Sequence, residues 1–303
     1  MKLALPAAAM GLKTAIIDRD ALGGTCLNRG CIPSKMLIYP TELPGLIERA
    51  GRVNLHMDSP ARVDFSKLIE RTSETVDGIS DDIRARLSQT PNLDLYAHHG
   101  EFIADKVLRA GPDELHAETI FIATGSRPAI PDIPGLIDTP FMTSREALRR
   151  ETLPDRLLVI GAGYIAVELG TAYAGAGAQV EFIVRSHFLR QEDQEVAETF
   201  SRVFSETRMV HQGLLPTEVD YRQGEFLVTC HDEAGRQRLL KADALLVATG
   251  ITPCTDNLGL DHTGIETDDK GYMRVDDHLQ TGVPGVYALG DCVGRYLFRH
   301  TVN

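Results

Sequence analysis

The 303-residue sequence lacks several features that would place it in other classes of protein. No apolar run approaches the ~20 residues that a transmembrane helix needs. The start, MKLALPAAAMG, lacks the order of charged, apolar and cleavage-site regions of a signal peptide. Low-complexity segments and long charge runs are also absent. We therefore expect a folded protein of the cytoplasm, with no membrane partner and room for roughly two domains.

Basic residues are also scarce. Lys and Arg number 31 against 43 Asp and Glu, which gives a formal net charge of -12. This balance argues against nucleic acid or an anionic membrane as the main partner, because both would attract a basic surface. A small-molecule substrate fits better.

Cysteines are too few for a secreted protein held together by disulfides, since there are only five. A close pair such as Cys26 and Cys31 is therefore better explained by redox or metal chemistry. A zinc site would need two further ligands at suitable spacing. Cys230, Cys254 and Cys292 form no such cluster, and the ten histidines are scattered. We expect these three cysteines to be structural and predict no metal site.

One arrangement occurs twice along the chain. A strand-like apolar run ends in Ala-Thr-Gly at residues 120–125 and again at 245–250. A buried strand at 13–18 precedes the first run, and strands at 157–160 and 180–184 precede the second. The simplest interpretation is two related nucleotide-binding units.

The segments around these units complete the expected organisation. Residues 63–87 have the apolar spacing of an amphipathic helix, and 127–140 form a connection rich in Pro and Gly. We place a domain boundary near Leu148. Short strands are expected at 272–275 and 286–289, where the chain returns to the first domain.

The two ends of the chain resemble interior positions of a longer protein. A dinucleotide-binding unit should open with a strand and a Gly-rich turn. This chain instead begins in what resembles the helix after that turn, and it stops at Asn303 just beyond an expected binding loop. We therefore expect a fragment or a truncated gene model.

Residues 161–166 read Gly-Ala-Gly-Tyr-Ile-Ala and lie between an apolar strand and a helical stretch at 167–174. That context favours a pyrophosphate-binding turn, in which Gly161 allows the tight turn and Gly163 allows close approach of the backbone. The alternative is an ordinary glycine turn.

The ends of the predicted strands indicate which nucleotides bind. Asp18 ends the first strand, where an acid would bind the adenosine ribose. After the strand at 180–184 come Arg185 and, further on, Arg190, with Glu181 only inside the strand. Arginine pairs with a 2′-phosphate, so NADPH is favoured over NADH. Two merely solvated arginines are the alternative.

Residues 22–35, Leu-Gly-Gly-Thr-Cys-Leu-Asn-Arg-Gly-Cys-Ile-Pro-Ser-Lys, carry the strongest signal. Cys26 and Cys31 are separated by four residues and can close a small disulfide ring if Gly24 and Gly30 permit a turn. A thiolate near a helix N-terminus or a cation is stabilised, which makes a reactive pair plausible. On composition alone, two unrelated buried thiols remain the alternative.

This segment resembles the redox-active signature of the class I pyridine nucleotide-disulfide oxidoreductases, which include dihydrolipoamide dehydrogenase and the glutathione, mycothione and mercuric reductases. The resemblance runs from about Leu12 to Gly294. It implies that Cys26 exchanges with substrate and that Cys31 faces the flavin as a charge-transfer thiolate. Lys35 then resembles the lysine beside the flavin N5.

The resemblance also implies roles in the second unit. Glu168 resembles the carboxylate partner of Lys35, and Tyr164 resembles the aromatic gate over the flavin. Residues 289–292, Leu-Gly-Asp-Cys, resemble the second flavin segment, in which Asp291 accepts hydrogen bonds from the ribityl chain. The residues implied in binding FAD or NADPH (or NADH) are Asp18, Gly24, Thr25, Lys35, Thr124, Gly125, Gly161, Gly163, Arg185, Arg190, Gly250 and Asp291.

The fold that the resemblance implies is α/β, with two Rossmann-like dinucleotide-binding domains. Residues 1–148 would begin the FAD-binding domain, without its first strand and Gly-rich turn. Residues 149–270 would form the NAD(P)-binding domain, and 271–303 the second part of the FAD-binding domain. The dimerisation domain of the family, with its His-Glu pair, would be absent. The full-length parent would be a homodimer, while this fragment would bind FAD poorly and have little activity.

The activity implied is flavin-dependent disulfide oxidoreduction, in which electrons pass between NAD(P)H, FAD and a Cys26-Cys31 disulfide. A dihydrolipoyl dehydrogenase-like enzyme is the first choice, acting on a small-molecule disulfide or dithiol. Mercuric, glutathione and mycothione reductases are alternatives. A non-catalytic, redox-sensing relative is an alternative of another class.

Overall fold

The computed structural model describes residues 3–55 and 58–295 of the chain. The chain divides into two compact units. Unit 1 contains the residues up to Asn28, Asp77–Arg127 and the residues from Ile251 onward, and unit 2 contains Arg29–Val76 and Pro128–Gly250. The domain boundaries predicted above stay a prediction. Residues 1–2, 56–57 and 296–303 of the predicted domains lie outside the described part of the chain.

A four-stranded parallel sheet forms the centre of unit 2. Its strands lie in the order β10-β9-β8-β14. They are β8 (Arg156–Ile160), β9 (Gln179–Val184), β10 (Met209–Gln212) and β14 (Ala244–Val247). The strands predicted at 157–160 and 180–184 and in the second Ala-Thr-Gly run are thereby confirmed. This strand order, with α6 between β8 and β9, is that of a Rossmann-like half.

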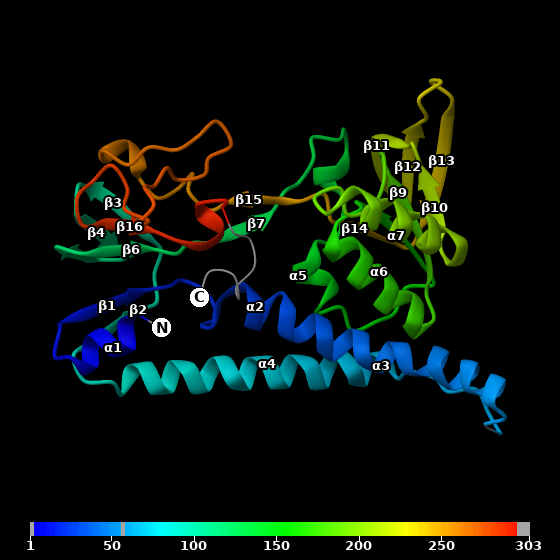
Figure 1. Cartoon of the computed structure of the whole chain (residues 1–303), viewed down its shortest axis with the longest axis horizontal. Coiled ribbons are helices and arrows are strands. Elements are labelled where there is room, and N and C mark those ends of the chain that lie inside the picture. The colour runs from blue at the N-terminus through cyan, green and yellow to red at the C-terminus, as the bar shows by residue number, and fades with distance from the viewer. Residues whose placement is uncertain (1–2, 56–57, 296–303) are drawn as a thin grey trace. The chain divides into compact units, whose positions relative to one another are not determined.

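Alternate residues of these strands face opposite sides of the sheet, as strand geometry requires. On one side, Leu157 and Val159 of β8 join a core with α3 (Cys31–Ala50), α5 (Ser144–Ala147) and α6 (Tyr164–Ala176). On the other side, Leu158 and Ile160 pack against an antiparallel three-stranded sheet. That sheet consists of β11 (Leu215–Arg222), β12 (Glu225–His231) and β13 (Gln237–Ala242). Figure 1 shows α6 on one side of these strands and β11, β12 and β13 on the other.

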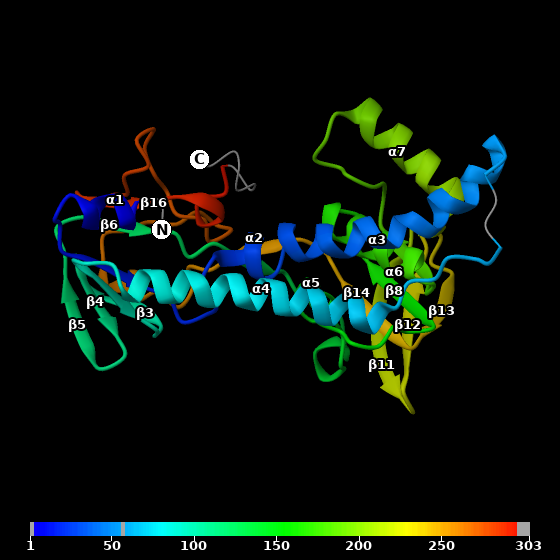
Figure 2. The same cartoon turned by 90° about the horizontal axis from the view of Figure 1, so that it is seen from below.

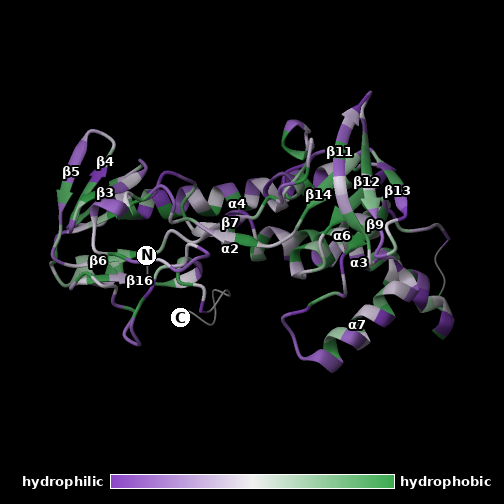
Figure 3. Cartoon of the chain, turned by 90° about the horizontal axis from the view of Figure 1, so that it is seen from above, coloured by the Kyte–Doolittle hydropathy of each residue, from purple (hydrophilic) through white to green (hydrophobic). Residues whose placement is uncertain are grey.

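The last helix of unit 2, α7 (Gln194–Thr207), is amphipathic. Its Phe200 and Phe204 form edge and stacked contacts with each other and with Phe188, and Phe204 also contacts Phe182. The opposite face of α7 carries charged residues, so the helix alternates between hydrophilic and hydrophobic colours in Figure 3. Figure 2 shows the loop that leads into α7. Residues 185–193 join β9 to α7 and include Arg185 and Arg190.

Unit 1 is built from short sheets. β1 (Thr14–Ile17) pairs in parallel with β2 (Leu93–Tyr96), and β6 (Ile120–Ile122) pairs in parallel with β16 (Val286–Ala288). The predicted strands at 13–18, 120–122 and 286–289 are therefore confirmed. An antiparallel sheet contains β3 (Gly100–Ala104), β4 (Val107–Ala110) and β5 (Asp113–His116). The short helices are α1 (Ala4–Ala9) and α2 (Gly24–Asn28).

One long helix has residues in both units. The predicted helix at 63–87 is confirmed as α4 (Phe65–Ser88), whose residues divide between the two units after Val76. Phe65, Leu68 and Ile69 of α4 belong to the core of unit 2, and Leu87 to a core of unit 1. The remaining elements are β7 (Ser126–Pro128), β15 (Ile251–Pro253), η1 (Gly51–Val53), η2 (Leu136–Asp138), η3 (Leu260–His262) and η4 (Gly290–Cys292).

The predicted strand at 272–275 is wrong. Met273 makes only an isolated bridge to Thr267, and its N–H donates to the carbonyl of Cys292 at 2.8 Å. Asp268 accepts from the N–H groups of Lys270 and Tyr272 and closes a tight turn directly before this segment. The turn uses the backbone that a longer ladder would need, so only one bridge forms.

The buried Cys230 provides a test of this core by pH. It lies in the core between the two sheets of unit 2, and burial raises the pKa of its thiol to about 11. The thiol of a cysteine in an unfolded chain has a pKa of about 8.5. The unfolded chain therefore loses its proton first. The protonated Cys230 thiol therefore contributes to the free energy of unfolding in full below about pH 8.5. This contribution, roughly 3 kcal/mol, is expected to be lost as the pH rises through the pKa of the folded state.

The measurement is urea unfolding of the wild-type chain and of Cys230→Ala between pH 7 and pH 11. Other groups titrate in this range, so the difference between the two chains isolates the thiol. The free energy of unfolding should fall more steeply with pH in the wild type. Parallel pH profiles would contradict the burial of this thiol.

Candidate redox and nucleotide-binding site

The two cysteines of the motif lie in successive helices. Cys26 is half-buried in α2 of unit 1, and Cys31 is exposed as the first residue of α3 in unit 2. All five cysteines of the chain are thiols in the structure. The first turn of α3 contains no acid, and no side chain caps its start. The positive end of the helix dipole at Cys31 is therefore unopposed by a carboxylate of its own first turn.

Asn28 holds the turn that precedes Cys26. Its side-chain Nδ2 donates to the carbonyls of Ala21, Leu22 and Gly24 at 2.9, 3.1 and 3.2 Å. Its Oδ1 is buried and has no hydrogen-bond partner among the described residues. Burial of an unpaired acceptor is costly, so this atom is a place where a bound group can donate a hydrogen bond. Asn28 lies within the 22–35 motif, but its local sequence does not reveal this role.

Lys35 and Glu168 meet in unit 2. The Lys35 Nζ lies 2.5 Å from the Glu168 Oε1, and their side chains are 61% and 34% exposed. Lys35 lies one turn after Cys31 on α3, and Glu168 lies in the second turn of α6. The two helices pack closely because Gly175 has no side chain: a Cβ there would lie 2.3 Å from the Thr41 carbonyl oxygen. An exposed ion pair adds little stability. This pair matters because it joins α3, which begins at Cys31, to α6, which follows the Gly-rich turn.

The Gly-rich turn follows β8 and leads into α6. Gly161 has φ of +138°, and a Cβ there would lie 2.2 Å from the carbonyl oxygen of Ala248. Gly163 is the N-cap of α6, and a Cβ there would meet no atom within 4 Å. The first turn of α6 has no acid and no side-chain cap. The turn is thus open on the side of the helix N-terminus, as an anion-binding turn requires.

Tyr164 begins α6 directly after this turn and is 39% exposed. Its hydroxyl is hydrogen-bonded to the carboxylate of Glu192. That bond, followed by burial and by the negative charge of Glu192, raises the pKa of Tyr164 above its ordinary value. Sequence analysis did not identify Glu192, because nothing in the local pattern connects residues in separate elements.

Arg185 and Arg190 are both exposed in the loop after β9. Glu181, the acid noted within this strand, is instead bonded to the neighbouring strand β10, where its Oε2 lies 2.6 Å from the His211 Nε2. These two side chains are 28% and 17% exposed. The first residue after β9 is therefore an exposed arginine, Arg185, and the acid within the strand is paired with His211.

The second expected flavin segment lies in unit 1. Asp291, in η4, accepts a hydrogen bond from the Ser126 hydroxyl at 2.6 Å, and Ser126 directly follows Thr124 and Gly125. The structure thus brings the first Ala-Thr-Gly motif and Asp291 together. The buried Cys292 lies beside the same turn, and burial raises the pKa of its thiol.

The other predicted residues lie at turns and strand ends. Asp18 follows β1 and accepts the N–H of Asp20 at 3.1 Å. Gly24 has φ of +73° with open space around its Cα, and Thr25 follows it in α2. Gly250, with φ of +130°, comes shortly after β14. Which of these residues contact a cofactor stays a prediction.

Within residues 3–55 and 58–295, no helix is both long enough and apolar enough to cross a bilayer. In the same residues, no three His, Cys, Asp or Glu side chains gather in a way that could hold a metal ion.

Comparison with known proteins gives several relatives. The chain is 34% identical over 287 residues to mercuric reductase of Staphylococcus aureus, covering 93% of this chain and 51% of that protein. It is 34% identical over 301 residues to dihydrolipoyl dehydrogenase of Haloferax volcanii, covering 96% and 62%. The chain thus spans about half the length of the curated relatives it matches.

Solved structures give the same picture. The HOCl-induced flavoprotein disulfide reductase RclA from Escherichia coli is similar with a TM-score of 0.86 and 29% sequence identity, over 99% of this chain and 65% of that one. The α/β fold class expected from the sequence is confirmed. Residues 1–302 also match the family described as pyridine nucleotide-disulphide oxidoreductase. The chain therefore belongs to the pyridine nucleotide-disulphide oxidoreductase family.

Proposed function

We propose that this chain carries the redox centre and nucleotide-binding parts of a flavin-dependent disulfide oxidoreductase that uses NADPH. The observation that carries the proposal is the 2.5 Å pair of Lys35 and Glu168. It joins the helix that begins at Cys31 to the helix that begins at the Gly-rich turn. A redox thiol and a nucleotide site are thereby linked through one charged contact within unit 2.

The residues present fit the two nucleotides. The uncapped N-terminus of α6, with Gly161 and Gly163 before it, fits a pyrophosphate. In unit 1 the Ser126–Asp291 pair and the unpaired Asn28 Oδ1 offer polar atoms to a flavin nucleotide. Bound FAD would supply two-electron transfer between nicotinamide and a thiol pair. Lys35, with Glu168 fixing its ammonium, would stand beside the flavin.

The thiol chemistry belongs to Cys26 and Cys31. Reduction of their disulfide takes up two electrons and two protons and yields two thiols. The Cys26 thiolate then attacks one sulfur of a substrate disulfide and releases the other as a thiolate, which takes up a proton. The Cys31 thiolate attacks Cys26 in turn, releasing the second substrate thiol and restoring the disulfide. The reverse sequence oxidises a dithiol.

The charges of the site support a choice of coenzyme, and the relatives support a choice of substrate. Arg185 and Arg190 support NADPH rather than NADH, since Glu181 is bonded to His211. The first candidate substrate is a small dithiol or disulfide of the dihydrolipoyl type. Mercuric ion is the second, favoured by the 34% identity to a mercuric reductase. Glutathione and mycothiol disulfides remain candidates. We propose a cytoplasmic homodimer for the whole protein.

A redox sensor without turnover is the competing function. It would hold nucleotide and report oxidation, and it would need no Lys35–Glu168 pair. The presence of this pair in contact supports the enzyme.

The test counts thiols. The chain is oxidised, loaded with FAD and given NADPH without oxygen, and its thiols are then titrated. The proposal predicts two more reactive thiols with NADPH than without it, and none gained in Cys26→Ser. An unchanged thiol count in an FAD-loaded chain that consumes NADPH would contradict the disulfide step and favour another use of the flavin.

A further inference from the structure

The loop between β9 and α7 is fixed by other elements of unit 2. Its backbone makes three hydrogen bonds with them: Gln212 Nε2 donates to the Ser186 carbonyl at 2.6 Å, Phe188 N–H to the Ser201 hydroxyl at 3.0 Å, and Leu189 N–H to the Ala162 carbonyl at 2.8 Å. Leu189 also has φ of +54°, an uncommon backbone conformation for a branched residue. Backbone held in this way is pre-organised. Arg185 and Arg190 project from it.

Gln212 is the only one of these three partners that acts next to Arg185. It is the last residue of β10 and pairs with Val184, the last residue of β9. The next N–H, that of Gly213, donates to the Val184 carbonyl at 2.8 Å. The Gln212 side chain then reaches past Arg185 to the Ser186 carbonyl at 2.6 Å. The peptide group before Arg185 and the one after Ser186 are therefore both held from β10.

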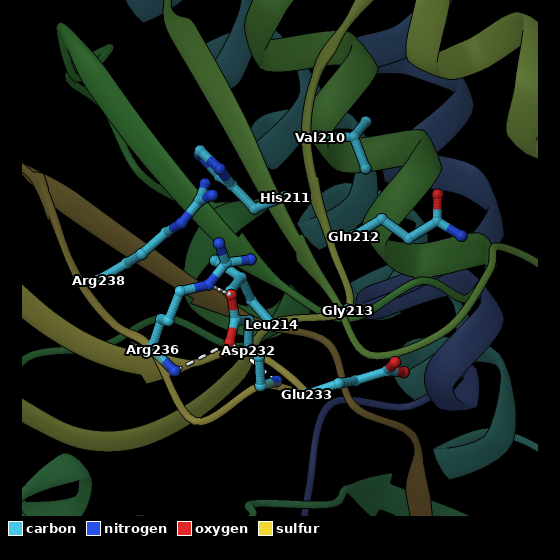
Figure 4. Close-up of a pocket in the computed structure, with 10 residues that line it drawn as sticks. Val210, His211, Gln212, Gly213, Leu214, Asp232, Glu233, Arg236 and Arg238 are labelled. Carbon is cyan, nitrogen blue, oxygen red and sulfur yellow. Dashed lines mark hydrogen bonds and ion pairs between the residues drawn. The ribbon is translucent and has the colours of Figure 1, made fainter.

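Gln212 lies between two cavities. A cavity of about 740 Å³ is lined by residues 210–214 and by the β12–β13 turn, and another of about 540 Å³ is lined by His187 and α7. Gln212 borders both. In Figure 4 its side chain points away from Arg236 and Arg238, which line the opposite side of the first cavity. Its amide therefore lies at an open, solvated strand end, where one hydrogen bond contributes little to folding.

We propose that Gln212 is a positioning residue for coenzyme selection. By holding the Ser186 carbonyl it fixes the backbone from which Arg185 presents its guanidinium to the 2′-phosphate of NADPH. This inference rests on the proposed NADPH-binding function of Arg185. A fixed backbone lowers the ordering cost of a long side chain, and that gain is realised only with a ligand that the side chain contacts.

The test compares two nucleotides that differ only in the 2′-phosphate. Binding of 2′,5′-ADP and of 5′-ADP to the whole chain is measured by calorimetry, so no turnover is required. Gln212→Leu should weaken 2′,5′-ADP about three- to tenfold, the range for one hydrogen bond, and 5′-ADP by less than about twofold. Gln212→Glu keeps the shape but cannot donate from its carboxylate and adds a negative charge, so it should weaken 2′,5′-ADP further.

A matched control is Gln179→Leu. Gln179 is exposed at the first position of β9, at the opposite end of the strand that carries Arg185, and its replacement should change neither affinity. In a chain that already carries Arg185→Ala, Gln212→Leu should have no further effect on 2′,5′-ADP, because the two changes remove one interaction.

Equal weakening of both nucleotides, no weakening of either, or additive effects in the double variant would overturn the role of Gln212. A wild-type chain that binds 2′,5′-ADP no better than 5′-ADP would instead overturn the NADPH assignment of Arg185, and the role of Gln212 with it. The two failures are therefore distinguishable in one set of titrations.

Discussion

Cys31→Ser and Cys26→Ser are each expected to abolish NADPH-dependent reduction of a disulfide substrate by the FAD-loaded protein. Serine is close in size, so the fold should persist, but its hydroxyl forms no disulfide and is a weak nucleophile at neutral pH. The effect should be complete in both variants because exchange needs both sulfurs. Consumption of NADPH by the flavin alone should remain in both.

A suitable control is Cys254→Ser, since Cys254 is a half-buried thiol of unit 1 outside the motif. Disulfide reduction is followed as formation of substrate thiols, and NADPH consumption as loss of its absorbance. If Cys26→Ser retained wild-type thiol formation while Cys254→Ser lost it, the reactive pair would have been assigned to the wrong residues.

Gly161→Ala is expected to destabilise unit 2 by about 3 kcal/mol or more, the upper range for a strained backbone combined with overpacking. The φ of +138° is disfavoured for alanine, and the new Cβ would lie 2.2 Å from the Ala248 carbonyl oxygen. That oxygen belongs to backbone and cannot rotate away. The turn must therefore shift, and the proposed pyrophosphate site should be lost with it.

Gly163→Ala separates folding from binding. Its backbone conformation is ordinary, with φ of -87°, and a Cβ there meets no atom within 4 Å. Urea unfolding should therefore differ little from that of the wild type. The added methyl group would stand at the mouth of the turn, where a pyrophosphate must approach closely, so NADPH affinity should fall. Normal urea stability of Gly161→Ala would refute the packing argument.

The sequence was most informative where one element determined its own structure. After Arg156, β8 is a continuous apolar run buried on both faces, and so is β14. β9 is apolar apart from Gln179 and Glu181, and all three strands were predicted correctly. The alternation in β12, with Phe226, Val228 and Cys230 buried, is the period-two signal of a half-buried strand and was missed. Its neighbour β13 is largely exposed and shows no such pattern, so the three-stranded sheet was not foreseen.

The candidate site shows the same limit. The cysteine motif and the Gly-rich turn are local and could be read directly from the sequence. The partners that act across elements could not be read in this way. Glu192 is hydrogen-bonded to Tyr164 of α6, and Gln212 of β10 donates to the Ser186 carbonyl in the loop after β9. The contact of Lys35 with Glu168 spans 133 positions and was expected only from the family resemblance. Long-range polar contacts leave no periodic trace in a sequence.

The central claim is that Cys31 lies against a flavin that NADPH reduces. The most direct measurement is the absorbance spectrum of the FAD-loaded chain during anaerobic titration with NADPH and, separately, NADH. We predict a long-wavelength band from a thiolate beside the oxidised flavin, formed at lower concentrations of NADPH than of NADH and missing in Cys31→Ser. Flavin bleaching by NADPH in the FAD-loaded chain without that band would contradict it.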